Sequence, residues 1–570
     1  MIDDVLELFR GQYVAVYFLI ILPVTLSLSP THKTSGGAPN VVQEFKVFRL
    51  QHFDLQGTQH GSRAWRVNFE AVSLNSRHMI RRCLVLWWKD LNPDSLHQTI
   101  TSNLGAVLIV LPESLNALDG TEWQLLRTLE ERLLEKPFAV PVYVTSKSPT
   151  VTDILRNIDT QGKSENGSAL NAMFSAVVAN GYQLVNGNQA SSVTIEAPTY
   201  NIIGKLATYD RSERVSSIAI VAHYDSFGLA PALSFGADSN ASGVAALLEL
   251  LRIFSKLYQT SKTRARYNLI FILTAGGKFN YQGARQWIDE HVEQIESGHS
   301  PKLEFAVCFD SLAKSGQTLN MHVSKIPKET SAVGRFYQTL QSVAQPNGRN
   351  MTMIQKKINL GEEYLAWEHE RFSIKKLYAF TLSGFENHRD SLRWSMMDTQ
   401  DKADLDALYQ NTQSVAEALA RHVFELKDTG GDHFFDDFKV ERENLNAWIR
   451  ALTSKARSMQ TLVGTGGGAT SSTAKLTDPL LHDLLLTVEH YAHEAHSTPV
   501  KTDKRDPDFL LYGATTDTMF AYRVKPAIFD LILALIIAAH LGLVYFLVLN
   551  AFSLQVRLRS YLSAMKTKQT

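Results

Sequence analysis

The chain has 570 residues, and its 57 basic side chains balance its 57 acidic ones, so the formal net charge is zero. This balance argues against a nucleic-acid partner or a strongly acidic substrate. Hydrophobic residues make up 45% and charged residues 20% of the chain, which excludes a disordered polymer and is typical of a folded protein. The length exceeds that of one ordinary domain.

Residues 1–30 contain a short apolar run, Tyr13–Leu26, that is interrupted by Pro23. A run of this length favours a signal peptide over a membrane span. The residues before it are net acidic and no clear cleavage site follows, so a retained signal anchor stays open. In both cases the sequence predicts a lumenal position for the domain that follows.

After a polar linker, residues 43–190 predict an accessory lumenal lobe. Apolar runs at 105–111 and 138–144 read as strands, and an amphipathic helix is expected between them at 121–134. Strands that alternate with helices indicate an α/β lobe with parallel strands.

Residues 191–425 contain a series of apolar strands that end in polar motifs. The first strand ends in His223-Tyr-Asp225, and a Gly236-Ala-Asp-Ser-Asn-Ala-Ser-Gly243 turn follows before a helix. A second strand at 267–274 leads into a glycine-rich turn, and a third ends in Asp310. This order and spacing resembles the co-catalytic zinc aminopeptidases. The resemblance implies an aminopeptidase-like (phosphorylase/hydrolase-like) α/β fold, with a mixed sheet flanked by helices.

The same resemblance identifies four positions at which this chain departs from that family. Ser239 stands where an aspartate bridges two zinc ions, and Gly277 and Lys278 stand at two glutamate positions. Trp394 falls about where the last histidine ligand belongs. Hydrolysis by a metal-bound water needs a carboxylate base. Glycine cannot serve as that base, and the positive charge of lysine opposes metal binding.

His223, Asp225 and Asp310 keep their family identities, with Asp225 in a supporting role. Zinc sites normally have at least three protein ligands, so His223 and Asp310 alone leave too few. We therefore expect a vestigial site without metal, cofactor or catalysis. Taken alone, a His-x-Asp pair often arises by chance. Asp310 taken alone fits the role of a strand-end or capping residue. An active enzyme would need other ligands, such as His369 or His388.

Residues 426–525 predict a helical appendix with helices near Arg442–Leu462 and Leu480–His496. Between these helices lies the glycine-rich loop 464–473, which has the composition of a flexible linker. The second helix would carry four histidines, for which we expect a solvated face and not a metal site. These histidines are His482, His490, His493 and His496.

Residues 531–549 form an apolar run without formal charge, and residues 550–570 form a basic tail. The run is near the minimum length for crossing a bilayer, and the positive-inside rule places the tail in the cytosol. Lys566 and Lys568 resemble a dilysine retrieval signal of endoplasmic reticulum membrane proteins; the alternative is a plain basic tail.

Two cysteines and three glycosylation sequons complete the inventory. Cys83 and Cys308 could pair or remain free buried thiols. The sequons begin at Asn166, Asn240 and Asn350, and each is a candidate acceptor for an N-linked glycan. A sugar on Asn240 would crowd the vestigial site; the alternative is an unmodified loop residue.

A degenerate aminopeptidase domain in a lumen, followed by one C-terminal span, resembles the group of nicastrin-like and nicalin-like proteins. The run Gly276–Gly283 and the few cysteines are closer to the nicalin-like members. The resemblance implies a non-catalytic, single-pass subunit of the endoplasmic reticulum membrane. It also implies two partners, a nodal modulator protein and a small multispanning membrane protein. The implied role is at the translocon, in the insertion of multipass membrane proteins, and the family is also linked to nodal signalling. The alternatives are an active lumenal zinc aminopeptidase and a lumenal receptor that binds peptides in an emptied cleft.

Overall fold

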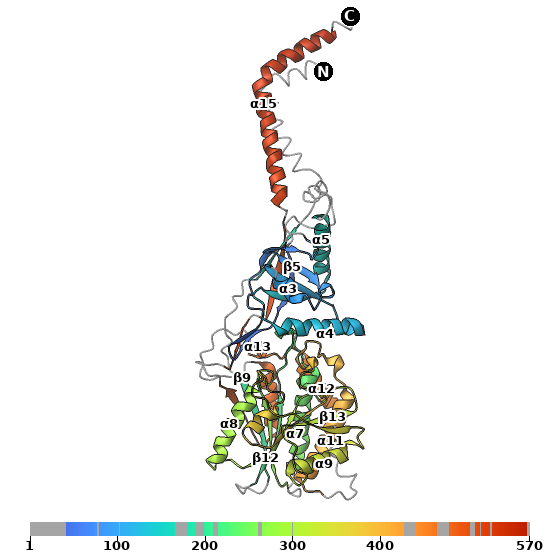
Figure 1. Ribbon diagram of the computed structural model, residues 1–570, viewed down its shortest axis with the longest axis vertical. Helices are drawn as coiled ribbons and strands as arrows, with labels where there is room; N and C mark the ends of the chain where they lie inside the picture. Colours follow the sequence, from blue (N-terminus) through green and yellow to red (C-terminus); the bar gives the residue numbers. More distant parts are fainter. Residues whose placement is uncertain are drawn as a thin grey trace.

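The computed structural model describes residues 42–566, apart from 77–78, 102, 166–180, 188–198, 209–214, 260–264, 299, 427–438, 464–477, 502–507, 514 and 525–526. The predicted signal segment 1–30, the sequon at Asn166, the loop 464–473 and Lys568 lie outside the described residues. A core, a lobe and the long helix α15 (Ala527–Lys566) follow one another along the longest axis (Figure 1).

An eight-stranded mixed sheet forms the core. In spatial order its strands are β14 (Asn350–Gln355), β13 (Thr318–Val323), β15 (Ala379–Ser383), β12 (Leu303–Phe309), β10 (Ser217–His223), β11 (Asn268–Thr274), β9 (Thr199–Leu206) and β16 (Glu494–Val500). The central strands β10, β11 and β12 run parallel to one another. Helices cover both faces of the sheet, which explains why these strands are continuous apolar runs in the sequence.

Two helical layers enclose this sheet (Figure 1). One face packs against α7 (Gly243–Gln259), α9 (Ala332–Ala344), α11 (Leu405–Val423), α12 (Arg442–Thr453) and α14 (Pro479–Tyr491). The other face packs against α8 (Gln282–Glu296) and α10 (His369–Ile374). The aminopeptidase-like α/β core expected from the motifs is confirmed.

The lobe is a closed seven-stranded barrel. Its strands, in order, are β1 (Gln43–Arg49), β18 (Thr516–Val524), β8 (Gly181–Asn186), β4 (Asn68–Val72), β5 (Cys83–Trp87), β6 (Ala106–Leu111) and β7 (Val142–Ser146). Its helices are α3 (Leu96–Thr101), α4 (Gly120–Glu135) and α5 (Pro149–Glu165). β6 and β7 are parallel, as the alternating pattern predicts, and β5, which was not predicted, pairs in parallel with β6. Helix α4 lies across the junction of the lobe with the core (Figure 1).

The segment predicted as a helical appendix contributes strands to three different sheets, so the purely helical prediction is wrong. β16 pairs with β9 in the core, β17 (Phe509–Leu511) pairs with β2 (His52–Leu55), and β18 closes the barrel between β1 and β8. β2 also pairs with β3 (Thr58–Gly61). Each strand completes an edge offered by a distant part of the chain, and such tertiary pairing overrides local propensity.

The helices of this segment are also shorter than predicted. Helix α14 ends at Tyr491, so His493 and His496 lie outside it and His490 and His493 do not share a helical face. The expected helix at 442–462 is divided into α12 and α13 (Met459–Leu462), because Ser458 caps a new helix by accepting from the backbone N–H of Thr461. Serine in this position satisfies an otherwise free N–H group at a helix start.

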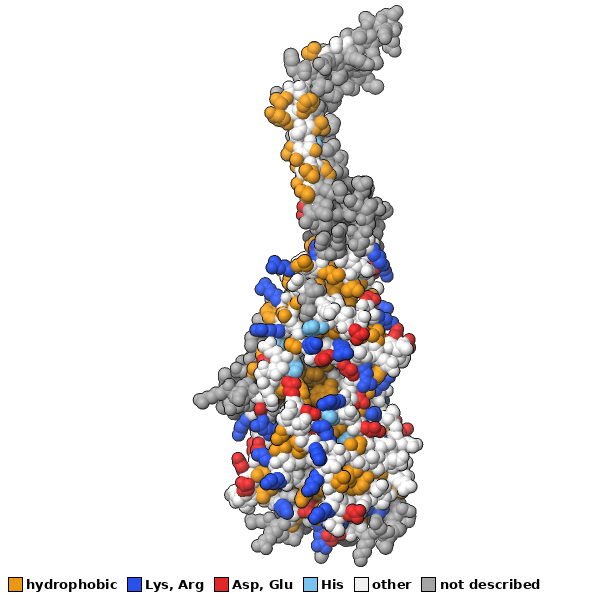
Figure 2. Space-filling view, in the orientation of Figure 1, with side chains coloured by type: hydrophobic (Ala, Val, Ile, Leu, Met, Phe, Trp, Pro, Cys, Tyr) orange, Lys and Arg blue, Asp and Glu red, His pale blue; other side chains and the backbone are white. Residues whose placement is uncertain are grey.

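Helix α15 presents large apolar side chains to its surroundings, including Leu531, Leu535, Leu541 and Leu549 (Figure 2). Within the described ranges, no helix has both the length and the apolar character needed to cross a membrane. The predicted span at 531–549 is therefore not confirmed.

Candidate functional site: a buried charge cluster at the strand ends

The carboxyl ends of β10, β11 and β12 meet at one edge of the sheet, because the three strands are parallel. Asp225 and Asp310 follow β10 and β12, and the turn after β11 supplies Lys278. The loop after β15 adds Arg393 and Asp398. We refer to these five residues as the strand-end cluster, and all five are buried.

Asp310 forms a two-point ion pair with Arg393. The guanidinium donates from Nε to Oδ2 at 2.9 Å and from a terminal nitrogen to Oδ1 at 3.3 Å. Its plane lies over Trp367, 4.1 Å from the ring centroid. Burial would raise the pKa of Asp310, but Arg393 and Lys278 outweigh it and hold that pKa well below its usual range. Asp310 is thus an ionised partner of a fixed internal cation.

Lys278 brings together the positions at which the chain departs from the zinc aminopeptidases. Its Nζ donates to Ser239 Oγ and to the backbone oxygen of Arg393, both at 2.7 Å. The ammonium lies 5.1 Å from the Trp394 ring centroid. Burial lowers the pKa of Lys278 to about 8, although Asp310 opposes the shift. Lys278 therefore contacts two of the other positions singled out in the sequence, Ser239 and Trp394.

Asp225 supports the turn that carries Lys278. Its carboxylate accepts from the backbone N–H of Gly277 at 2.7 Å and from that of Lys278 at 2.9 Å. Because both oxygens are used in this way, Asp225 fixes the main chain beside the cluster and directs the lysine side chain toward Ser239.

His223 packs directly against Gly277. A Cβ atom added at Gly277 would lie 2.1 Å from the His223 ring, so the ring occupies the volume that any side chain at 277 would need. Nδ1 of His223 lies 3.5 Å from Oε2 of Glu368, a buried contact. No partner for Nε2 of His223 is found among the described residues.

Asn240, the candidate glycan acceptor in the vestigial loop, is 0% exposed. Its side-chain amide donates to the backbone oxygens of His223 at 2.9 Å and Phe309 at 3.0 Å. It therefore ties the loop to the ends of β10 and β12. The folded structure contradicts a glycan on Asn240, because the nitrogen that would carry it is enclosed and already bonded.

Asp398 holds the loop that contains Ser239 from the opposite side. It accepts from the backbone N–H groups of Asp238 and Ser239, both at 2.8 Å. Burial raises the pKa of Asp238 to about 7, and the nearby charge of Asp398 adds to the shift. Arg457 provides a further buried cation and donates to the backbone oxygens of Phe235 and Gly236.

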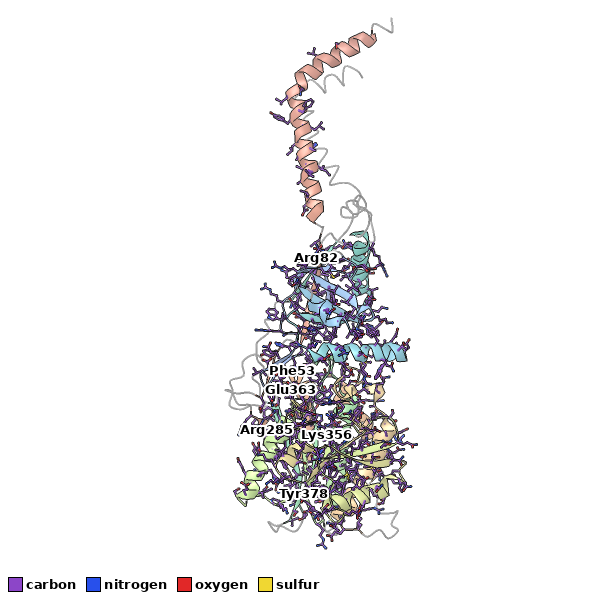
Figure 3. The ribbon with its side chains drawn as sticks, viewed as in Figure 1. Phe53, Arg82, Arg285, Lys356, Glu363 and Tyr378 are labelled. Carbon is purple, nitrogen blue, oxygen red and sulfur yellow. The ribbon has the colours of Figure 1, made fainter. Side chains whose placement is uncertain are left out.

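An aromatic cluster covers the strand-end cluster on the side of the lobe. It contains Phe53, Phe227, Phe279, Tyr364, Trp394 and Phe509, drawn from both the lobe and the core. The Phe227 and Trp394 rings meet edge to face with centroids 5.6 Å apart. In the surface view, hydrophobic side chains form the floor of a hollow at the level of the junction, and Phe53 lies at that level (Figures 2 and 3). Trp394 of this aromatic cluster lies beside Lys278 of the strand-end cluster.

A second contact fastens the lobe to the loop that carries Arg393. Glu130 of α4 accepts from the backbone N–H groups of Leu229 and Met396 at 2.8 Å and from the Ser395 hydroxyl. Burial raises the pKa of Glu130 to about 7, although these hydrogen bonds oppose the shift. The lobe thus positions Ser395 and Met396, two and three residues beyond Arg393.

The remaining predicted site residues do not assemble into a metal centre. In the part of the chain that the structure describes, no group of three or more His, Cys, Asp and Glu side chains could hold a metal ion. His369 is buried and its Nδ1 contacts the Thr381 hydroxyl, while His388 lies near Glu362. Cys83 and Cys308 are separate buried free thiols, which excludes a bond between them.

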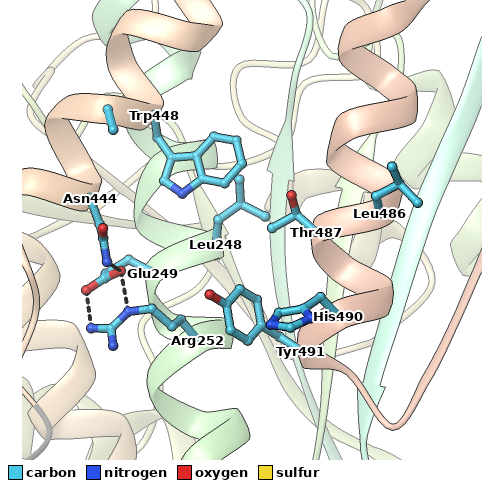
Figure 4. Close-up of a pocket in the computed structure, with 10 residues that line it drawn as sticks. Leu248, Glu249, Arg252, Asn444, Trp448, Leu486, Thr487, His490 and Tyr491 are labelled. Atoms are coloured by element: carbon cyan, nitrogen blue, oxygen red, sulfur yellow. Dashed lines mark hydrogen bonds and ion pairs between the residues drawn. The ribbon is translucent and has the colours of Figure 1, made fainter.

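A cavity of about 430 Å³ lies apart from this site, between α7, α12 and α14 (Figure 4). Trp448 and Tyr491 contribute its aromatic lining. Its charged residues Glu249 and Arg252 bond to each other at 2.7 Å, so their charges are already compensated within the protein.

Sequence reasoning missed Arg393, Glu130 and Arg457. Arg393 stands directly before Trp394, but nothing in its local sequence indicates that it points toward Asp310. The only available signal is indirect: a retained acid at the site needs a buried positive charge when a metal is lost.

Comparison with known proteins places the chain in a family. The model of peptidase family M28 matches residues 201–419. The human BOS complex subunit NCLN is 36% identical over 552 residues, covering 95% of each chain. Nicalin of Caenorhabditis elegans is 30% identical over 570 residues and covers 96% of each chain. The crystal structure of the gamma-secretase component nicastrin aligns with a TM-score of 0.59 at 10% identity, covering 84% of this chain and 99% of that one, which shows a shared fold. The chain belongs to the nicalin family, whose vertebrate members carry the name BOS complex subunit NCLN.

Proposed function

We propose that this protein is a non-catalytic, membrane-anchored subunit of a complex in the endoplasmic reticulum. One observation carries the non-catalytic part: Lys278 and Arg393 occupy the strand ends where zinc aminopeptidases are expected to hold their metal ions. Arg393 takes both oxygens of Asp310, and Lys278 bonds to Ser239.

Charge makes this arrangement incompatible with a zinc ion. Two unit charges about 4 Å apart interact with about 4 kcal/mol at an effective dielectric of about 20, and a divalent ion doubles that figure. A zinc ion beside Asp310 would be repelled by both Arg393 and Lys278. The cations therefore replace the metals as the charges that balance the buried acids.

The site also lacks room and a base. The His223 ring fills the volume that a side chain at 277 would occupy, and a carboxylate base there would need His223 to move. The alternative reading, an active aminopeptidase, requires that rearrangement as well as loss of the Asp310–Arg393 pair. The reading as a peptide receptor requires displacement of the aromatic cluster over the site.

The membrane anchor belongs to the same proposal. Residues 531–549 carry a row of exposed leucines and isoleucines on α15, and burying them in lipid would remove their apolar surface from water. The basic tail at 550–570 then lies in the cytosol, with Lys566 and Lys568 as a retrieval signal. The lobe and core lie in the lumen.

The partners follow from the family. Relatives that match nearly the whole chain are named as BOS complex subunits, and we propose that this chain is a subunit of the corresponding complex. The nodal modulator protein, a small multispanning membrane protein and the translocon are the expected partners. Assistance to multipass protein insertion is the expected role, and a link to nodal signalling follows from the same family.

Two measurements test the proposal. The first uses the intact chain purified in detergent. We expect no stoichiometric zinc by elemental analysis and no turnover of aminopeptidase substrates. We expect the same for Ser239→Asp, because Arg393 still occupies Asp310. Bound zinc with turnover that His223→Ala abolishes would contradict the proposal.

The second measurement is co-purification from cells. The intact chain should bring down a multispanning membrane protein and translocon components. A matched variant, with residues 531–549 replaced by a leucine–alanine run of equal length, separates anchoring from specific helix contacts. Recovery of the chain in a soluble fraction without membrane partners would refute the anchored-subunit proposal.

A further inference from the structure

The structure separates two glycosylation sequons that the sequence presents as equivalent. Asn240 is enclosed, and its side-chain nitrogen donates to two backbone oxygens. Asn350 is exposed at the first residue of β14. An N-linked glycan needs its asparagine nitrogen at the surface, so only Asn350 of these two can carry one in the folded protein.

The geometry of β14 suits an acceptor site. Successive side chains of a strand point to opposite faces, and here Met351 is buried against the core while Asn350 and Thr352 are exposed. The asparagine and the threonine that complete the sequon therefore project from the same face, and both are exposed there. Side chains of this strand's neighbour that face the same way, Asn320 and His322, are buried, which leaves β14 as the accessible border.

β14 is also an edge. Among the described strands it pairs with β13 alone. A strand that is paired on one side presents free backbone groups on the other and can recruit a strand of a second molecule. A bulky hydrophilic group at the first residue of such a strand would prevent that approach.

We infer that Asn350 carries an N-linked glycan, that Asn240 does not, and that this glycan shields the β14 edge from pairing with another copy of the chain. The inference rests on the lumenal placement in the proposed function. It adds a modified residue and a role for the modification.

The test is site-specific glycopeptide mass spectrometry on the full chain purified from cells, with enzymatic deglycosylation in heavy-oxygen water to mark occupied asparagines. We expect the mark at Asn350 and none at Asn240. Thr352→Ala should remove the mark at Asn350, and Thr352→Ser, which preserves the sequon, should retain it. A mark at Asn240 in folded protein would overturn the inference.

A third variant separates failure of this inference from failure of the lumenal placement. Lys328→Asn places an asparagine two residues before Thr330, in an exposed loop ahead of α9. If this asparagine is marked and Asn350 is not, the inference fails and the lumenal placement stands. If neither asparagine is marked, the lumenal placement is wrong, and the inference that depends on it is wrong as well.

Size-exclusion chromatography in detergent tests the shielding. Thr352→Ala should show a larger share of self-associated protein than Thr352→Ser at equal concentration. Equal shares for the two variants would overturn the shielding role.

Discussion

Two buried carboxylates, Asp310 at the strand ends and Glu130 at the lobe–core junction, have pKa values that move in opposite directions. Burial disfavours the ionised form of both. At Asp310, Arg393 and Lys278 overcome burial and hold the pKa well below its usual range. The donors that bond to Glu130 are neutral, and burial raises its pKa to about 7. At Asp310 two positive charges outweigh burial, whereas at Glu130 three hydrogen bonds offset it only in part.

The opposite pKa shifts of Asp310 and Glu130 also distinguish two kinds of buried contact in this protein. The strand-end cluster contains the buried ion pair of Arg393 with Asp310. The Glu130 contact joins two structural units through backbone donors, and its strength depends on pH. Four substitutions test this comparison.

Arg393→Met should have the largest effect, because it leaves Asp310 as an unpaired buried charge. Removal of one partner of a buried ion pair typically costs about 3–5 kcal/mol. The free energy of unfolding of the full chain in detergent, followed by tryptophan fluorescence in urea, measures the loss. Arg389→Met is the matched control, because Arg389 pairs with Glu362 at the surface; equal losses in the two variants would contradict the interpretation.

Gly277→Ala should come next. The added methyl group would meet the His223 ring at 2.1 Å, and overpacking of this kind costs about 1–3 kcal/mol. Gly120→Ala in α4 is the control, because a Cβ there has no atom within 4 Å. Urea unfolding of the two variants compares the strand-end region with the lobe, and an unchanged midpoint for Gly277→Ala would show that His223 can move aside.

Glu130→Gln tests the other carboxylate through pH. A pKa raised to about 7 in the folded state means that the native protein binds this proton more tightly than the unfolded chain. The contribution of Glu130 is therefore greatest at low pH and is lost as the pH rises through about 7. Relative to Glu130→Gln, the parent protein should lose up to about 1 kcal/mol per pH unit between the unfolded and folded pKa values. Parallel stability profiles for the two proteins would refute the assignment.

His60→Gln should have the smallest effect. His60 of β3 lies 3.0 Å from Glu363 of the core and stacks on Phe53. Both side chains reach solvent, so when the imidazole carries a second proton the ion pair should contribute less than about 1 kcal/mol. The free energy of unfolding of the parent and the variant is measured at low and high ionic strength. The difference between them should shrink in salt. A large loss of stability that does not depend on salt would show that ring stacking, and not charge, joins the lobe to the core.

Much of the core could be predicted because its signals are local. Continuous apolar runs predict buried strands, and parallel strands bring their ends to one edge. The motif resemblance predicts that His223, Asp225, Lys278 and Asp310 belong to one site. The segment after α14 could not be predicted, because its strands form only where β9, β2 and the barrel leave an edge unpaired.

The sequence by itself determined that Ser239, Gly277, Lys278 and Trp394 stand at the motif positions where the resemblance to zinc aminopeptidases expects ligands and a base. Only the tertiary structure decided which side chains meet there. Arg393 reaches Asp310 across a separation of 83 residues, and burial gives that contact its strength. Local sequence encodes residue type and periodicity, whereas the partner of a buried charge depends on which side chain the folded chain brings within about 3 Å of it.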